Sequence, residues 1–351
     1  MLNLRIIRSP LPQAENEAIL SEYNQLTSAG IPMEEFLHWL QGGPEGPAWH
    51  VILETDEGEI VGHQSLIPFR GSYGGRKIVA AKSEYTFLRE AFRSTKIRGF
   101  EHSSRPTHFI ASKKLLDHGQ AQGWGPILIS TTPALHRWAS SIGCSPVQVP
   151  LWECLLVLRP WDAARKTPNL DQWRRASLCA AGLFQRTIWS PSLLFPHHSN
   201  GIRPVPVGDN HVSSNRDALT FFEDQNSLQW RYLEGQYERI ELSAKSHEFV
   251  ILKKGSIDRY LRICQWRLDS EGPSLSSVAS LVRMAQKEKA LGIRWSVYGS
   301  GEPTLSFVRR VRMLGFLCAR RRRTLLVRSD DERFLDGARW NLTDAMFSFD
   351  P

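Results

Sequence analysis

The 351-residue sequence predicts an α/β fold with mixed sheets, built as two similar units that a connecting helix joins. Segments typical of strands and helices follow one another in the order β-α-α-β-β-β-α-β-α-β over residues 1–160. Nearly the same order returns after residue 201. In each half, a helix opens at a proline (Pro133 or Pro303) and stops at a glycine (Gly143 or Gly315) before a long strand. These three observations indicate an internal duplication.

We therefore expect one unit over residues 1–160, a connecting segment over 161–200 and a second, more degenerate unit over 201–351. The connecting segment has a polar start and then a helix-like stretch, Leu170–Trp189, with Trp173 and Phe184 at helical spacing. Pro191 and Pro196 mark the boundary after it. Packing between the units is the favoured role of this helix, and lying on a membrane surface is the alternative.

The elements of the first unit follow from alternation in strands, helical spacing of apolar residues, and glycine or proline at the breaks. They are a strand Asn3–Arg8, helices Pro12–Ser28 and Met33–Leu40, strands Ala48–Glu54, Glu59–Phe69 and Arg76–Leu88, a helix Thr107–Gln122, a strand Pro126–Ser130, a helix from Thr132 to Gly143, and a strand Val147–Leu158.

The same patterns predict the second unit. Its elements are a strand Ile202–Val207, a helix near Ser213–Gln225, strands Tyr237–Ser243, Glu248–Lys254 and Arg259–Leu268, a helix Leu275–Ala290, a strand Ile293–Tyr298, a helix Pro303–Leu314 and a strand Phe316–Val327.

Charge and cysteine usage limit the possible partners and location. The net charge of +8 favours anionic partners, such as CoA, nucleotides, nucleic acid or a membrane surface. The five cysteines are scattered without a C-x-x-C pair, and no histidines have metal-ligand spacing, so we expect no metal site. The sequence has neither a secretory signal pattern nor an apolar run of spanning length. We expect a cytoplasmic protein with reduced thiols and no transmembrane segment.

Short motifs resemble the GNAT (GCN5-related N-acetyltransferase) superfamily. The strand at Glu59–Gln64 is similar to the family's G-x-x-V-G strand, and Ala91-Phe92-Arg93 is similar to the P-x-Y-R that opens its acyl-CoA loop. Leu135–Cys144 and Val308–Phe316 both resemble the late family helix that ends in Leu-Gly-Phe. The resemblance covers most of the chain as two tandem GNAT-like units.

The resemblance implies a cofactor site in the first unit, where the fourth strand bulges and splays from the fifth. Thr86, Phe87 and Leu88 would then pair with the pantetheine of acyl-CoA, and the loop that follows would wrap the pyrophosphate at a helix N-terminus. The residues implied for that loop are Arg93, Ser94, Thr95, Lys96, Ile97 and Arg98. Ser94 and Lys96 replace the family's glycines. Lys96, Arg98 and Arg105 could supply charge in place of backbone contacts.

The resemblance also implies catalytic roles. Glu84 lies on the fourth strand, where relatives place a general base, but the favoured interpretation is an ordinary half-exposed strand residue. The family's general acid is a tyrosine, but Ala139 and Val311 occupy its two positions here. Ser140, Tyr85 or water would have to protonate the leaving thiolate.

The function implied is an N-acyltransferase that moves an acyl group from acetyl-CoA or another acyl-CoA to an amine, with an amino sugar or another small metabolite as the acceptor. One alternative is a Fem-like transferase that takes its aminoacyl group from charged tRNA, the one reading that needs a nucleic acid. The other is a catalytically inactive GNAT-like scaffold. The run Arg320–Arg323 is either a solvated strand edge or an anion site, because strand alternation allows only two of its members on one face.

Overall fold

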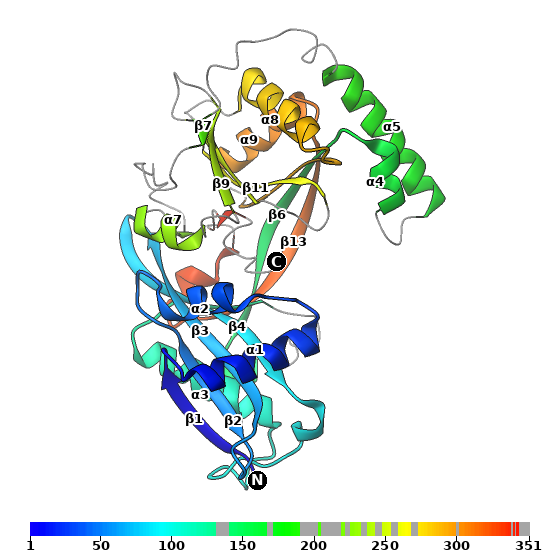
Figure 1. Ribbon diagram of the computed structural model, residues 1–351. Coiled ribbons are helices and arrows are strands. Elements are labelled where there is room, and N and C mark those ends of the chain that lie inside the picture. Colours follow the sequence, from blue (N-terminus) through cyan, green and yellow to red (C-terminus); the bar gives the residue numbers. More distant parts are fainter. Residues whose placement is uncertain are drawn as a thin grey trace.

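The computed structural model contains one continuous sheet of fourteen strands, which extends through both halves of the chain (Figure 1). The structure describes residues 1–130, 140–166, 171–189, 203–204, 219–221, 225–232, 237–242, 248–253, 259–267, 273–299, 302–337, 340 and 342–343. Along the main path the strands follow the order β1-β2-β3-β4-β5-β13-β6-β12-β11-β10-β9-β7.

The first half of the sheet, which we call the first half-sheet, consists of four antiparallel strands and one parallel strand. These are β1 (Asn3–Arg8), β2 (Trp49–Glu54), β3 (Ile60–Tyr73), β4 (Arg76–Leu88) and, parallel to β4, β5 (Ile127–Ser130). β3 runs four residues beyond its predicted end because the hairpin turns at Gly74 and Gly75. Both glycines adopt positive φ angles, which a two-residue hairpin turn requires.

Helices cover both faces of the first half-sheet. α1 (Gln13–Thr27) and α2 (Met33–Gln41) share a core with Ile52, whereas α3 (Thr107–Ala121) shares a core with the neighbouring Val51. Neighbouring strand residues point to opposite faces, so these two cores lie on opposite sides of the sheet. Each of these elements was predicted to within a few residues.

The second half-sheet repeats this plan. Its strands are β7 (Arg203–Pro204), β9 (Tyr237–Glu241), β10 (Phe249–Lys253), β11 (Leu261–Arg267) and, parallel to β11, β12 (Gly292–Tyr298). α8 (Leu275–Lys287) and α9 (Glu302–Met313) share the core of this half-sheet.

One predicted helix, Ser213–Gln225, was wrong over part of its length. Thr220 and Phe221 form a short strand, β8, that pairs with Gly71 and Ser72 of β3, and a helix, α7, begins only at Gln225 and ends at Arg231. Phe221 packs edge-on against Phe69, so a tertiary contact outweighs local helix propensity here. The predicted helix from Thr132 to Gly143 lies largely outside the described residues.

The two half-sheets exchange their last strands. β6 (Ser145–Val157) continues the first half of the chain but pairs along β12, whereas β13 (Leu317–Arg328) continues the second half but pairs with β5. The two exchanged strands also pair with each other along eleven register positions. They form the ribbon that connects the upper and lower parts of the molecule in Figure 1. The division of the chain at residues 160 and 201 stays a prediction.

The connecting segment folds into α4 (Pro160–Lys166) and α5 (Gln172–Trp189), which lie on the outer side of the second half-sheet (Figure 1). The Gln185 side chain accepts the Val157 N–H and donates to the carbonyl of Gly315. These bonds join the helix to β6 and to the end of α9. Within the described residues, no helix combines the length and hydropathy that crossing a bilayer requires.

Candidate functional site

β4 and β5 pair over a short distance and then separate. Their parallel register covers Ala81 to Ser83 on β4, opposite Ile127 to Ile129 on β5. Beyond Ser83, the described part of the chain contains no strand on this edge of β4, which pairs with β3 alone through Leu88. The backbone of residues 84–88 therefore has one edge that the sheet leaves open.

A β-bulge distorts β4 at the point of separation. The register with β3 passes from Glu84 opposite Ser65 to Phe87 opposite His63, so two residues of β4 face the single residue Gln64. Tyr85, inside the bulge, has a φ of 50°, an unusual conformation for a bulky residue. Its ring packs edge-on against Phe36 of α2.

A buried chain of hydrogen bonds holds this bulge. The Ser9 hydroxyl lies 2.7 Å from Nε2 of His50, Nδ1 of His50 lies 2.9 Å from Nε2 of His63, and Nδ1 of His63 lies 2.8 Å from the Tyr85 carbonyl oxygen. A carbonyl can only accept, so His63 must donate from Nδ1, His50 must donate from Nδ1 to His63, and Ser9 must donate to His50.

Both histidines are neutral in this arrangement. Burial lowers the pKa of His63 from 6.5 to about 4, although its bond to the Tyr85 carbonyl opposes the shift. Burial, and then the neighbouring His63, lowers the pKa of His50 well below its usual value. At neutral pH, each group in this chain of hydrogen bonds therefore donates in the same direction, toward the Tyr85 carbonyl.

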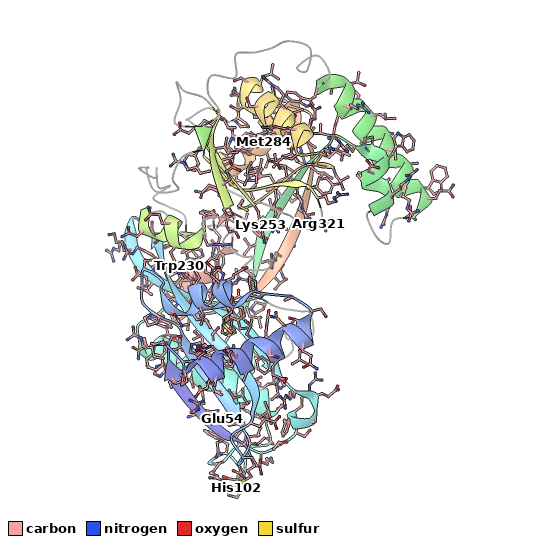
Figure 2. All side chains as sticks on the ribbon, viewed as in Figure 1. Glu54, His102, Trp230, Lys253, Met284 and Arg321 are labelled. Carbon is pink, nitrogen blue, oxygen red and sulfur yellow. The ribbon has the colours of Figure 1, made fainter. Side chains whose placement is uncertain are left out.

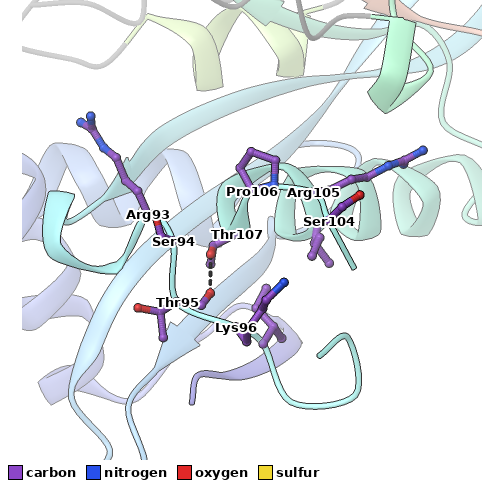
Figure 3. A pocket seen from close by; sticks show the side chains of 10 residues that line it. Arg93, Ser94, Thr95, Lys96, Ser104, Arg105, Pro106 and Thr107 are labelled. Carbon is purple, nitrogen blue, oxygen red and sulfur yellow. Dashed lines mark hydrogen bonds between the residues drawn. The ribbon is translucent and has the colours of Figure 1, made fainter. Parts of the chain in front are cut away.

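A pocket of about 220 Å³ opens between the loop after β4 and the N-terminus of α3 (Figure 3). Two of its lining residues are bonded to each other, because the Thr107 hydroxyl donates to the Thr95 carbonyl at 2.5 Å. Figure 3 shows Arg93 and Arg105 extending on opposite sides of the opening. The pocket is lined by Arg93, Ser94, Thr95, Lys96, Ile97, Ser104, Arg105, Pro106, Thr107 and Ile110.

Cationic side chains line the pocket. Arg93, Lys96 and Arg105 line it together with no acidic side chain. Pro106 precedes α3 and provides no side-chain cap, so the first N–H groups of the helix and its dipole also favour an anion here. Burial lowers the pKa of His108, and the nearby Arg93 charge lowers it further.

The structure brings most of the implied loop together but leaves one residue aside. Arg93 through Ile97 all line the pocket, whereas the Arg98 guanidinium pairs with Asp56 at 2.8 Å and is not among the lining residues. The glycine positions of the family are filled by exposed Ser94 and Lys96 side chains.

Thr86, Phe87 and Leu88 line a second, much smaller cavity of about 20 Å³ between β4 and α3. His108 and Ser112 of α3 lie on its other wall. This volume is of the size of one water molecule. Because α3 borders both cavities, its first two turns connect the open edge of β4 with the basic pocket.

Glu84 lies on the other face of β4 and forms an ion pair with Lys82 two residues before it. The Lys82 side chain is only 3% exposed and that of Glu84 is 13% exposed. Each charge therefore compensates the other in a site with little water. Glu84 has the carboxylate a general base requires, and its backbone carbonyl accepts a bond from Ser65.

Further charged groups gather on this face where the halves of the molecule meet. Arg231 of α7 is 1% exposed, and its guanidinium lies over the rings of Trp39 and Tyr237. Burial raises the pKa of Tyr85 well above its usual value, and the negative charges of Glu84 and Glu35 raise it further. The neighbouring Trp230 is labelled at this junction in Figure 2.

The second half-sheet has a matching separation, but the chain itself occupies it. β11 pairs with β12 only as far as Ile263 opposite Trp295, and Cys264 is the extra residue of a bulge. β6 covers one edge of β12 completely. On the remaining edge, just past Trp295, the short strand β14 (Leu342–Thr343) pairs with Val297 and Tyr298.

The two candidates for the general acid, and the residues at the two positions of the family's tyrosine, have different surroundings. Tyr85 is buried in the bulge, and Ser140 is exposed at the start of a short 3-10 helix. Val311 is fully buried in the core of the second half-sheet. Ala139 lies outside the described residues.

Sequence reasoning missed Ser9, His50 and His63, which hold the bulge, and Lys82, which pairs with Glu84. The hairpin of β2 and β3 contained a signal for the two histidines. Ile52 pairs with His63, which places His50, two residues earlier, on the same face as His63.

Comparison with solved structures identifies the fold. A protein of unknown function from Enterococcus faecalis V583, described as a probable N-acyltransferase, matches with a TM-score of 0.55 and 8% identity over 92% of this chain and 72% of its own. A candidate acetyltransferase from Pyrococcus horikoshii matches with a TM-score of 0.51 and 11% identity over 97% and 95%. A GCN5-related N-acetyltransferase from Anabaena variabilis ATCC 29413 matches with a TM-score of 0.50 and 12% identity over 92% and 72%.

No protein-family model matches the chain, and neither does any curated protein in sequence. The structural matches nevertheless extend through both halves. The chain has the GNAT fold, and the mixed α/β architecture predicted from the sequence is confirmed.

Proposed function

We propose that the protein is an acyl-CoA-dependent N-acyltransferase with its cofactor site in the first half-sheet. The observation that carries this proposal is the open edge of β4 past Ser83, with a bulge at its start and a basic pocket at its far end. An extended pantetheine arm can pair with such an edge as a strand would, and a pyrophosphate suits the positive pocket. Similarity of fold to N-acetyltransferases supports the proposal.

The bulge supplies the chemistry that polarises a thioester. The Tyr85 carbonyl accepts a hydrogen bond from His63 of β3. In a trans peptide the N–H points in the direction opposite to the C=O, so the Thr86 N–H of the same peptide points away from β3. That direction is the open edge. A thioester carbonyl oxygen there would accept this N–H, which stabilises the negative charge that develops during attack.

Acyl transfer would then proceed by direct attack. The acceptor amine nitrogen bonds to the thioester carbon, the C–S bond breaks, and CoA leaves as a thiolate. Glu84, close to the bulge, takes the proton from the amine directly or through water. The buried charges of Lys82, Glu84 and Arg231 favour a polar amine acceptor, such as an amino sugar or another small metabolite, at the junction of the halves.

We expect one acyl-CoA per chain. In the second half-sheet, β14 pairs with the edge of β12 that faces the separation from β11, and this separation corresponds to that of β5 from β4. A Fem-like use of charged tRNA and an inactive scaffold remain the competing functions.

Calorimetric titration with acetyl-CoA tests the proposal. The expected result is saturable binding with a stoichiometry of one, together with a melting temperature that rises with ligand concentration. Binding of charged tRNA without binding of acetyl-CoA would support the Fem-like function. If neither ligand binds, the result would support the inactive scaffold.

A further inference from the structure

Within the described residues, the connecting helix α5 packs against the rest of the molecule along one side. Cys179, Gly182, Gln185 and Trp189 are its buried residues. Gly182 approaches Pro160 so closely that a Cβ atom would lie 2.6 Å from the Pro160 Cβ. The Trp189 indole donates to the Leu314 carbonyl at 3.2 Å. These contacts set the rotation of the helix about its axis.

The opposite side of α5 is apolar and faces solvent. Trp173 is 84% exposed and Phe184 is 67% exposed, and Leu183 and Ile188 are also exposed. On a helical projection, the arc from Leu183 through Trp173 and Phe184 to Ile188 contains no charged residue, because its other members are alanine, serine and threonine. Trp161 of α4 adds a further ring that is 62% exposed. Half of the ten large exposed hydrophobic side chains in the described residues lie on these two helices.

Cations border this apolar side. On the same projection, Arg174 is the first charged residue beyond Ile188 and Arg186 is the first beyond Leu183. Arg175 lies further toward the buried side, and Arg165 lies on α4. All four side chains are exposed. Asp162 and Asp171 are the acidic residues among the described part of 160–189, and Asp171 pairs with Arg174 at 3.3 Å. The border is therefore positive overall.

A pocket of about 350 Å³ lies where α4 begins, next to α5. Arg159, Trp161 and Arg186 line it, with Asp162 as its acidic member. Two guanidinium groups with a tryptophan ring suit a phosphate group that is attached to an apolar chain.

We propose that α4 and α5 form a docking surface for an anionic lipid bilayer. The exposed rings and aliphatic side chains of α5 enter the boundary between headgroups and acyl chains, the flanking arginines contact anionic headgroups, and the Arg159–Arg186 pocket takes one lipid phosphate. An amphipathic helix with aromatic residues on one side and arginine on its flanks has the composition of a helix that lies in this boundary.

Charge complementarity favours a bilayer over a second copy of the chain. Two copies that met through α5 would bring their arginine borders together, and like charges in contact oppose association. A bilayer that contains anionic lipid presents the opposite charge over the whole border.

Flotation of the full chain with lipid vesicles tests this proposal. We expect the chain to float with vesicles of phosphatidylcholine mixed with phosphatidylglycerol, and to do so much less with pure phosphatidylcholine. The double variant Trp173→Ser with Phe184→Ser should lose at least about tenfold in partitioning to the mixed vesicles, because two large apolar side chains no longer enter the lipid. Arg159→Ala with Arg186→Ala should remove the preference for the anionic lipid.

Leu26→Ser is the matched control, because Leu26 is exposed on α1, far from α5 in the chain. It should float like the unchanged chain. All substituted side chains are at the surface, so each variant should keep its melting temperature. Equal flotation of the serine double variant and the control, or none for the unchanged chain, would overturn the proposal. Dimerisation that depends on Trp173 and Phe184, without flotation, would assign the surface to a second copy instead.

Discussion

Nδ1 of His63 donates a 2.8 Å hydrogen bond to the carbonyl oxygen of Tyr85, the residue whose positive φ forms the bulge of β4. The bond joins the side chain of one strand to the backbone of the next at the point where β4 leaves β5. His50 and Ser9 continue the contact into the core. The orientation of the peptide proposed to polarise the thioester therefore depends on a buried histidine of the neighbouring strand.

Replacing His63 should separate this positioning role from a merely structural one. His63→Ala leaves the Tyr85 carbonyl and the His50 N–H without partners, which should lower the free energy of unfolding by about 1–3 kcal/mol for each group. Turnover should fall by about tenfold or more. His63→Asn keeps a donor near the position of Nδ1 and should restore part of the turnover.

The readout is the ratio of the Kd for free CoA to the Kd for acetyl-CoA. Free CoA has no thioester carbonyl, so loss of the bulge geometry should weaken the binding of acetyl-CoA more than the binding of free CoA. If His63→Ala raises both Kd values by the same factor, His63 has no positioning role at the thioester.

Stability should depend on pH between about 4 and 6.5 because of the same histidine. The folded pKa of His63 is about 4 and its ordinary value is 6.5, so the unfolded chain binds the proton first as the pH falls. The stabilising contribution is therefore complete above pH 6.5 and is lost progressively toward pH 4, at about 1.4 kcal/mol per pH unit. His50, whose pKa is also lowered, acts in the same direction.

Urea unfolding across this pH range measures the slope. His63→Asn cannot titrate, so its slope should be shallower than that of the unchanged chain. Parallel slopes for the two proteins would contradict the assignment of neutral His63 in the folded state.

Removing the positive charge of the basic pocket should weaken the binding of CoA. Hydrogen bonds to charged groups contribute about 1.5–3 kcal/mol each, so Arg93→Ala with Lys96→Ala should raise the Kd for CoA by about tenfold or more. The remaining affinity should also depend less on salt. Arg76→Ala with Lys77→Ala removes the same charge from the exposed tip of the β3–β4 hairpin and should leave the Kd unchanged. A Kd that the two double variants alter equally would exclude the pocket.

Glu84→Gln should affect chemistry more than binding. Loss of a general base lowers turnover by about 100-fold or more, whereas acetyl-CoA should bind with nearly unchanged affinity because Glu84 lies on the other face of β4 from Thr86. The substitution also leaves the buried Lys82 without its counter-charge, so the melting temperature should fall. Lys82→Met with Glu84→Gln removes both charges and should recover stability without recovering turnover. Unchanged turnover in Glu84→Gln would remove Glu84 from the mechanism.

Local signals in the chain sufficed for most elements. The sequence predicted β1 and β4 with their observed bounds, from the alternation in Asn3–Arg8 and the strand-like run Arg76–Leu88, and Pro12 predicted where α1 begins. These patterns act between neighbouring residues, so they can be read before any partner is known. The resemblance in turn located the loop that borders the basic pocket.

The partners of β6 and β13 could not be predicted in this way. β6 alternates over part of its length and β13 contains the run Arg320–Arg323, and nothing in either pattern says that each strand pairs across the boundary between the two halves. The strand at Thr220–Phe221 forms only because β3 extends far enough to pair with it.

For this protein, periodicity and the order of the elements predicted the class of fold and the repeat, and the resemblance to GNAT proteins implied the residues of the loop after β4. Long-range packing settled the rest: the opening beside β4, the histidines that hold the Tyr85 carbonyl, the ion pair of Lys82 with Glu84, and the strand that fills the equivalent opening in the second half-sheet. The reason is physical. Periodicity specifies which side of an element is buried, whereas hydrogen-bond partners and openings depend on which edges meet, and those edges come from residues far apart in the chain.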